Sequence, residues 1–225
     1  MQFIRRHWYS LGLVPAAAAI AWGFWGHLGT IQFILLLNFA ALMLHQFEEY
    51  AWPGGEPWII NEVMQPKGNR PDRYPLNQNN AFVINVYMAW AFYLVPVFFP
   101  GLIWLGLATV LFGISQFFMH GIANNRKLHT LYNPGLAAVT LGHIPLGAWY
   151  LFEVYSKSLI TLWDWVFAVV AIGVFIGVGM LKIGYGVLAS EDSPYPFARE
   201  ELERFDRSGH LERIRKADAG ANAAA

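Results

Sequence analysis

Six long runs of apolar residues constrain this chain more than any other feature of its sequence. A helix that crosses the roughly 30 Å hydrocarbon core of a bilayer needs about 20 mostly apolar residues. The runs that meet this length are Trp8–His27, Ile31–Tyr50, Asn80–Phe99, Leu102–Gly121, Leu131–Phe152 and Leu162–Val187. They predict an all-α integral membrane bundle of about six transmembrane helices.

The composition agrees with a membrane protein and excludes several classes of function. Charged residues make up 13% of the 225 residues, whereas a soluble domain has roughly 25%. Lys+Arg and Asp+Glu number 15 each, so the chain lacks the basic excess that nucleic-acid binding requires. The sequence contains no cysteine, which excludes disulfides, thiolate metal ligands and cysteine nucleophiles.

The distribution of basic residues predicts how the bundle is oriented. With six spans, both termini lie on the same side of the membrane. Fourteen of the 15 Lys and Arg residues fall on that side, and only Lys157 falls on the other. Because cytoplasmic loops carry the excess of Lys and Arg, we expect a cell-membrane protein with both termini in the cytoplasm, N-in and C-in.

Two segments are expected outside the bilayer. The loop of residues 51–79 is rich in proline and glycine, and it falls on the cytoplasmic side. Residues 190–225 form a cytoplasmic tail with a charged, amphipathic stretch from Arg199 to Lys216. The chain is therefore predicted to consist of a transmembrane domain, residues 1–189, and this tail.

The end of the second span carries three ionisable side chains. His45, Glu48 and Glu49 are spaced i, i+3 and i+4, which places them on one face of a helix, and Asn38 lies two turns deeper. Ionisable groups in the hydrocarbon are costly, so they usually face the protein interior and have a partner. Two adjacent carboxylates beside an imidazole repel each other unless a proton or a cation intervenes.

Three further spans bring polar side chains to the same side of the membrane. His120 and Asn124 lie near the end of the fourth span, Asn80 begins the third, and Asn133 begins the fifth. In the predicted topology these helix ends lie at one depth. His143 is about 18 Å along the fifth span, so it reaches this level only if that span begins outside the bilayer.

The polar turn that opens the fifth span also has a simple structural interpretation. It reads Tyr132-Asn133-Pro134-Gly135. Proline is favoured at the first position of a helix and asparagine at the N-cap. The sequence therefore predicts a helix that begins at Pro134 with Asn133 as its cap.

The residue types that converge are those of a metal centre. His45, Glu49 and His120 are the predicted ligands, and Glu48 is the predicted catalytic base or bridging ligand. Imidazole with carboxylate suits one divalent ion, Zn²⁺ or Fe²⁺ above all. The predicted second-shell or substrate contacts are Asn38, Asn80, Asn124, Asn133 and His143.

The same residues resemble a known family. His45-x-x-Glu48-Glu49 late in the second apolar span, followed by His120 and the Tyr132–Gly135 turn, is similar to the pattern of the HXXEE family of multi-pass membrane proteins. The resemblance covers roughly residues 30–150. Because that family is uncharacterised, it supports the site but implies no reaction.

These observations predict a membrane-embedded, metal-dependent enzyme, a hydrolase or an iron-type oxidoreductase, that acts on a lipid or other apolar substrate at a cytoplasm-facing site. A proton-coupled small-molecule transporter, in which Glu48 and Glu49 exchange protons, is one alternative. A non-catalytic membrane assembly subunit, in which the cluster only ties helices together, is the other. The bilayer is the expected partner, and the sequence leaves the oligomeric state open.

Overall fold

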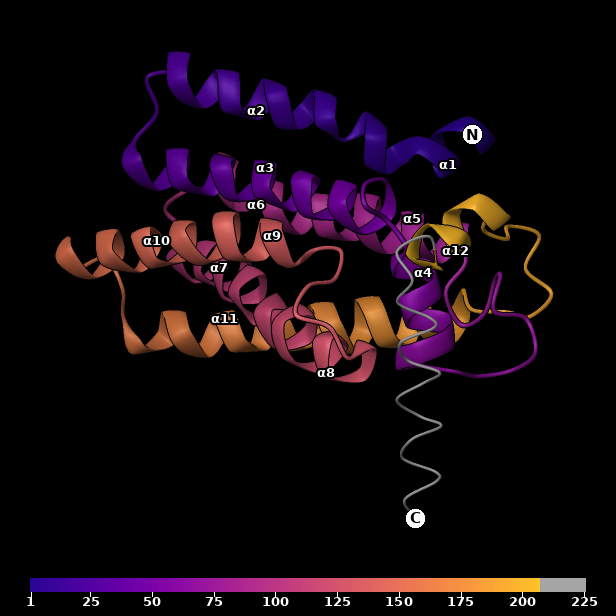
Figure 1. Ribbon diagram of the computed structural model, residues 1–225. Coiled ribbons are helices and arrows are strands. Elements are labelled where there is room, and N and C mark those ends of the chain that lie inside the picture. Colours follow the sequence, from indigo (N-terminus) through magenta and orange to yellow (C-terminus); the bar gives the residue numbers. More distant parts are fainter. Residues whose placement is uncertain (207–225) are drawn as a thin grey trace.

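The computed structural model describes residues 1–206, and all regular elements in that range are helical (Figure 1). The first half contains α1 (Gln2–Leu11), α2 (Leu13–Trp25), α3 (Thr30–Tyr50), α4 (Glu56–Trp58), η1 (Ile59–Met64), α5 (Gln78–Phe82), η2 (Val83–Trp90) and α6 (Ala91–Phe98). The second half contains α7 (Ile103–Phe117), η3 (Phe118–Asn124), α8 (Asn125–Leu128), α9 (Leu136–Ala138), η4 (Val139–His143), α10 (Ile144–Ser156), α11 (Leu162–Val174), η5 (Phe175–Val187) and α12 (Arg199–Asp206). The η elements are stretches of wider π-helix.

Several of these elements join end to end, and four of the resulting helices are long and apolar enough to cross a membrane. They are Thr30–Tyr50, Gln78–Phe98, Ile103–Leu128 and Leu162–Val187. Each covers one of the six predicted spans. The chain is thus all-α with four candidate membrane-spanning helices, while the count of six and the orientation stay predictions.

The other two predicted spans also form helices, but with different limits. The first was expected as one run, Trp8–His27, yet it divides at Gly12, and only 13 residues, Leu13–Trp25, remain in the apolar part. Pro15 in the first turn of α2 has no N–H to bond back into α1, which accounts for the break. The fifth forms a continuous helix from residue 136 to 156.

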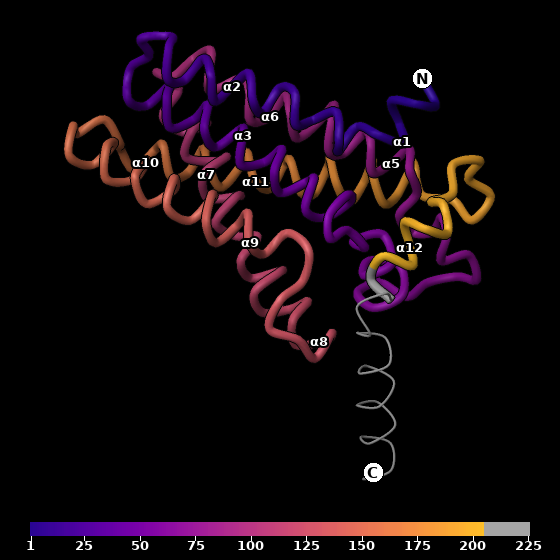
Figure 2. The backbone as a smooth tube through the Cα atoms, turned by 45° about the horizontal axis from the view of Figure 1, so that its top comes forward, coloured from indigo at the N-terminus to yellow at the C-terminus, as the bar shows by residue number. Residues whose placement is uncertain are grey.

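Helix α3 lies at the centre of the bundle. It packs against α2, α6 and α10, while α7 packs against α10 and α11 (Figure 2). Ile34, Leu35 and Met43 of α3 are at most 1% exposed and belong to the largest apolar core. Most of α3 is buried, and its polar residues near the C-terminal end, including His45, Glu48 and Glu49, lie inside the protein.

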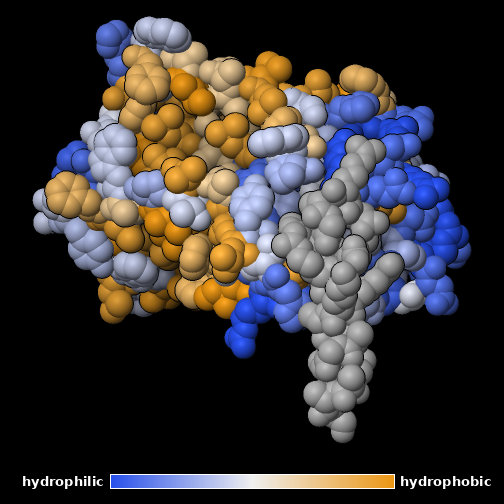
Figure 3. Space-filling view, in the orientation of Figure 1, coloured by the Kyte–Doolittle hydropathy of each residue, from blue (hydrophilic) through white to orange (hydrophobic). Residues whose placement is uncertain are grey.

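One end of the molecule is polar. Apolar residues gather over the long helices, whereas hydrophilic residues gather at the end that contains α4, α5 and α12 (Figure 3). The tail begins by packing on the loop before α5: Phe197 N donates to Asp72 O at 2.8 Å, and Gln78 N to Tyr195 O at 3.0 Å. The predicted amphipathic stretch begins at Arg199 as expected, and its part beyond residue 206 lies outside the described residues.

Candidate functional site

The three predicted ligands come together at the polar end of the bundle. His45 and Glu49 lie on the last two turns of α3, and His120 lies on η3. Each imidazole Nε2 is 3.3 Å from Glu49 Oε1, and the three ligand atoms all lie within 4.8 Å of one another. The residues are 5%, 9% and 2% exposed, so they form a site within the protein.

Both imidazoles are held by their other ring nitrogen. His45 Nδ1 is 3.1 Å from the carbonyl oxygen of Gly135, and His120 Nδ1 is 2.8 Å from Asn133 Oδ1. The Asn133 amide nitrogen donates to His120 O and to Asn125 Oδ1, which fixes Oδ1 as the atom facing the ring. These oxygens only accept, so both Nδ1 atoms are donors. In a neutral ring, each Nε2 then presents a lone pair to Glu49.

The spacing of these atoms fits a metal ion. Zinc binds nitrogen and oxygen ligands at about 2.0–2.1 Å, so two ligands of a tetrahedral site are about 3.3–3.4 Å apart. The two distances from Glu49 Oε1 match that separation. Metal-binding histidines almost always donate the second ring N–H to an oxygen acceptor, as His45 and His120 do here. The donor set can therefore hold a metal and leave a coordination position open.

The Tyr132–Gly135 turn lies directly over the ligands. Gly135 has φ +99°, and a Cβ at this position would lie 2.6 Å from His120 Cε1 and 2.8 Å from His45 Cε1. Only glycine fits such a conformation and so close an approach. The turn thus requires glycine for two independent reasons.

The predicted helix start at this turn was wrong. The helix begins at Leu136 after Gly135, and its free N–H groups are satisfied from another helix. Ala137 N donates to Glu48 Oε1 at 3.0 Å, and Ala138 N donates to Glu48 Oε2 at 2.8 Å. Asn133 is instead used to orient His120, because Glu48 supplies the oxygens that a cap would have provided.

Glu48 has no unused oxygen in this arrangement. Besides the two backbone donors, the Tyr132 hydroxyl donates to Oε1 at 2.6 Å. The carboxylate therefore joins α3 to the turn and to α9. Its role as catalytic base stays a prediction, and its three hydrogen bonds favour a positioning role.

His143 and Asn38 form a buried pair next to the ligands. His143 Nδ1 is 2.7 Å from Asn38 Oδ1, and the His143 ring centroid is 6.0 Å from that of His45. Tyr93 stands at the same ring distance from His143 on another side. Among the described residues, His143 Nε2, Asn38 Nδ2 and the Tyr93 hydroxyl have no hydrogen-bond partner. The polar interior thus continues from the ligands toward the middle of the bundle.

The remaining two predicted site residues have other contacts. Asn80 forms a capping box with Asn77 at the start of α5, and its amide also donates to Pro75 O and Gly184 O. Asn124 is 1% exposed, and its Oδ1 lacks a hydrogen-bond partner in the described part of the chain. Within residues 1–206, neither side chain is hydrogen-bonded to the ligands.

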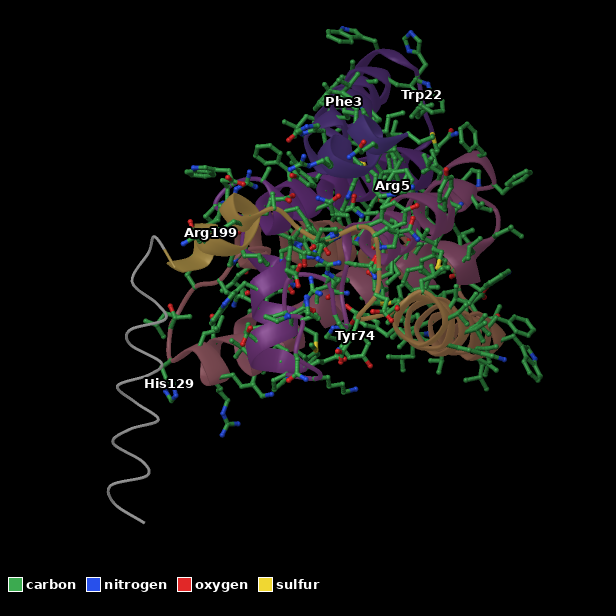
Figure 4. The ribbon with its side chains drawn as sticks, turned by 90° about the vertical axis from the view of Figure 1, so that its right-hand side faces the viewer. Phe3, Arg5, Trp22, Tyr74, His129 and Arg199 are labelled. Atoms are coloured by element: carbon green, nitrogen blue, oxygen red, sulfur yellow. The ribbon has the colours of Figure 1, made fainter. Side chains whose placement is uncertain are left out.

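A polar depression of about 650 Å³ lies beside the turn. It is lined by Asn125, Arg126, His129, Thr130, Leu131 and Tyr132. Tyr132, on its wall, donates to Glu48, the neighbour of Glu49 in the sequence. Asn125, also on the wall, accepts from Asn133, which in turn contacts His120. Figure 4 looks onto this end of the molecule, with His129 at its edge. A second, apolar groove of about 560 Å³, between α7 and α11, is lined by none of the site residues.

One carboxylate near the site was not predicted. Glu56, the first residue of α4, is 6% exposed, and burial together with the Glu49 carboxylate raises its pKa. Only one feature of the sequence could have pointed to it: Glu56 is an acidic residue in the tight Pro-Gly-Gly-Glu-Pro turn, seven residues after Glu49.

Comparison with known proteins places the chain in a family. The model of the HXXEE family, described as a protein of unknown function with HXXEE motif, matches residues 36–150, just over half of the chain. The chain belongs to this family, and the motif residues are His45, Glu48 and Glu49. Neither the curated proteins nor the solved structures gave a match.

Proposed function

We propose that this HXXEE-family protein is a membrane-embedded, metal-dependent enzyme that acts on a lipid or other apolar substrate. His45, Glu49 and His120 hold one divalent ion, Zn²⁺ or Fe²⁺. The reaction is a hydrolysis or an iron-type oxidation, because two histidines and one carboxylate are typical of both kinds of centre. The family match carries no activity, so the proposal depends on the site itself.

The observation that supports the metal site is that three acceptor atoms, His45 Nε2, His120 Nε2 and Glu49 Oε1, converge inside the protein. Both Nδ1 atoms donate to oxygen, so both neutral rings direct a lone pair toward an anionic oxygen 3.3 Å away. Such an arrangement is repulsive unless a positive charge lies between the atoms. A single divalent ion can bind all three acceptor atoms at once. Protons could bridge both nitrogen–oxygen pairs only if both histidines were protonated, which would place two imidazolium ions next to each other.

The surrounding residues have supporting roles in this proposal. Gly135 and Asn133 fix the orientation of the two rings, and Glu48 fixes the turn that contains them. A bound ion would supply a Lewis acid for hydrolysis or a redox centre for oxidation. Since the site lies at the end of a bundle of apolar helices, an apolar substrate can reach it with its polar group at the hydrophilic end.

Metal content tests the proposal. Detergent-purified wild-type protein from metal-supplemented cells should contain about one equivalent of zinc, iron or manganese by mass spectrometry. His45→Ala and His120→Ala should each lose it. His129→Ala, which removes an exposed imidazole beside the site, should retain it. Metal-free wild type, or metal retained in both ligand variants, would contradict the proposal.

Proton-coupled transport is a second candidate, favoured by the buried line of polar groups beyond His45. Asn38, His143 and Tyr93 extend this line toward the middle of the bundle with three unpartnered polar atoms. In this alternative, wild type contains no metal. Reconstituted vesicles would then show proton uptake that His143→Phe abolishes.

A further inference from the structure

Glu56 is a buried carboxylate that the proposed metal site leaves unused. It is 6% exposed, and its Oε2 has no hydrogen-bond partner among the described residues. Burying an anion without a partner is expensive, so such a group normally acquires a cation or a proton. Glu48, by contrast, has three donors on its two oxygens. Glu56 is therefore a buried carboxyl group that lacks the donors that Glu48 has.

The chain reverses direction to bring Glu56 back toward α3. Helix α3 ends at Tyr50, and Gly54 and Gly55 follow with φ of 74° and 109°. Gly54 N donates to Glu48 O at 3.0 Å, which closes the turn onto the last turn of α3. These left-handed conformations favour glycine. The turn places α4, and Glu56 with it, against the helix end that carries Glu49.

The charges that act on Glu56 belong to the proposed ligands. Burial and the Glu49 carboxylate raise the pKa of Glu56 to about 8, while His120 opposes this shift. Within the described residues, no Lys or Arg contributes to this balance. The geometry agrees with this, because α4 packs against α3 and the Gly54 N–Glu48 O bond ties the turn to the end of that helix. Glu56 lies outside the group of three residues whose ligand atoms are within 4.8 Å of one another.

The charge of the metal-loaded site favours a further anion whose charge is not already compensated, as that of Glu48 is by its three donors. A divalent ion with one carboxylate and two neutral imidazoles carries a net charge of +1. Placing that charge in a low-dielectric interior is unfavourable, and a nearby carboxylate removes the penalty. We propose that Glu56 is the second anion of the site, the carboxylate that neutralises the divalent cation held by His45, Glu49 and His120. This inference rests on the proposed metal site.

Zinc affinity tests this role directly. Wild type and variants are stripped of metal in detergent, and Zn²⁺ alone is titrated against a chromogenic chelator. Glu56→Gln removes the charge but keeps the shape, so its affinity for Zn²⁺ should fall by on the order of tenfold or more. Glu56→Asp keeps the charge and should remain within about threefold of wild type by the same reasoning. Glu62→Gln, an exposed acidic residue on the same short helical segment, should bind as wild type does.

Two failures are distinguishable in this experiment. If wild type binds one Zn²⁺ and Glu56→Gln binds it as tightly, the metal site stands and the role of Glu56 is wrong. If wild type binds no Zn²⁺, the metal site fails, and the role of Glu56 fails with it. A size-exclusion profile identical to that of wild type establishes that Glu56→Gln is folded, and retained affinity in Glu56→Asp separates a loss of charge from a loss of packing.

Discussion

At the scale of single residues, the site depends on atoms that carry no charge of their own. The Gly135 carbonyl and the Asn133 side chain decide which nitrogen of each histidine holds the proton. Had either acceptor been a donor, the ring would have presented N–H to Glu49, and no metal could bind. The proposed ligands bind the metal through Nε2 and a carboxylate oxygen, and the neighbouring acceptors fix the tautomer that leaves each Nε2 lone pair free to do so.

Gly135→Ala tests whether the turn over the two imidazoles needs a residue without a side chain. The new Cβ would lie 2.6–2.8 Å from both imidazoles, and alanine is strained at φ +99°. We expect the variant to lose its metal and to be less stable by about 1–3 kcal/mol. Thermal unfolding and metal analysis measure both effects. Gly101→Ala is the control, because a Cβ there meets nothing within 4 Å, and equal effects in the two variants would contradict this explanation.

At the scale of elements, one carboxylate joins two helices that are far apart in the sequence. Glu48 on α3 accepts from the first free N–H groups of α9, 89 and 90 residues later. A helix start buried in a protein needs such acceptors, and a negative charge at this end also interacts favourably with the helix dipole. The motif thus combines two of the proposed ligands, His45 and Glu49, with Glu48, which holds the Tyr132–Gly135 turn in place over them.

Glu48→Ala should therefore act mainly on stability. It removes three hydrogen bonds to a charged acceptor, each worth about 1.5–3 kcal/mol. We expect a clear drop in the thermal unfolding midpoint and weaker metal binding, since the turn also orients His45 and His120. Glu62→Ala, exposed on η1, should show neither effect. A Glu48→Ala variant that is inactive yet as stable as wild type would instead support Glu48 as the catalytic base.

At the scale of the whole molecule, the surface is apolar along the helix bundle and polar at one end of it. The long helices present an apolar surface, and the loop before α5, the start of the tail and α12 assemble at one end (Figures 1 and 3). The ligand group lies at that same end. An amphiphilic substrate would then keep its apolar part along the helices while its polar group reaches the metal.

The predicted orientation places this polar end in the cytoplasm. Since the sequence has no cysteine, single cysteines give an unambiguous accessibility assay. A membrane-impermeant maleimide added to intact cells should label Lys157→Cys and should not label Lys67→Cys until the cells are permeabilised. Labelling of Lys67→Cys in intact cells would reverse the topology.

The residues of the site could be predicted only in part. Helical spacing puts His45 and Glu49 on one face, and a common depth brings His120 to them. The helix start at Asn133 was wrong, because local capping preference was overridden by Glu48, which is distant in sequence. Glu56 was missed, because a turn with two left-handed glycines decides where the chain returns.

The sequence by itself determined the helical architecture, the long apolar helices and the residue types of the candidate metal site. These follow from local periodicity, from the length of apolar runs and from the cost of burying ionisable groups. Only the tertiary structure decided which acceptor faces each imidazole, that Glu48 caps a distant helix, and that the turn after α3 returns Glu56 to the end of that helix. These contacts join residues from separate helices and turns, and their energies depend on distances of a few ångströms that no local pattern encodes.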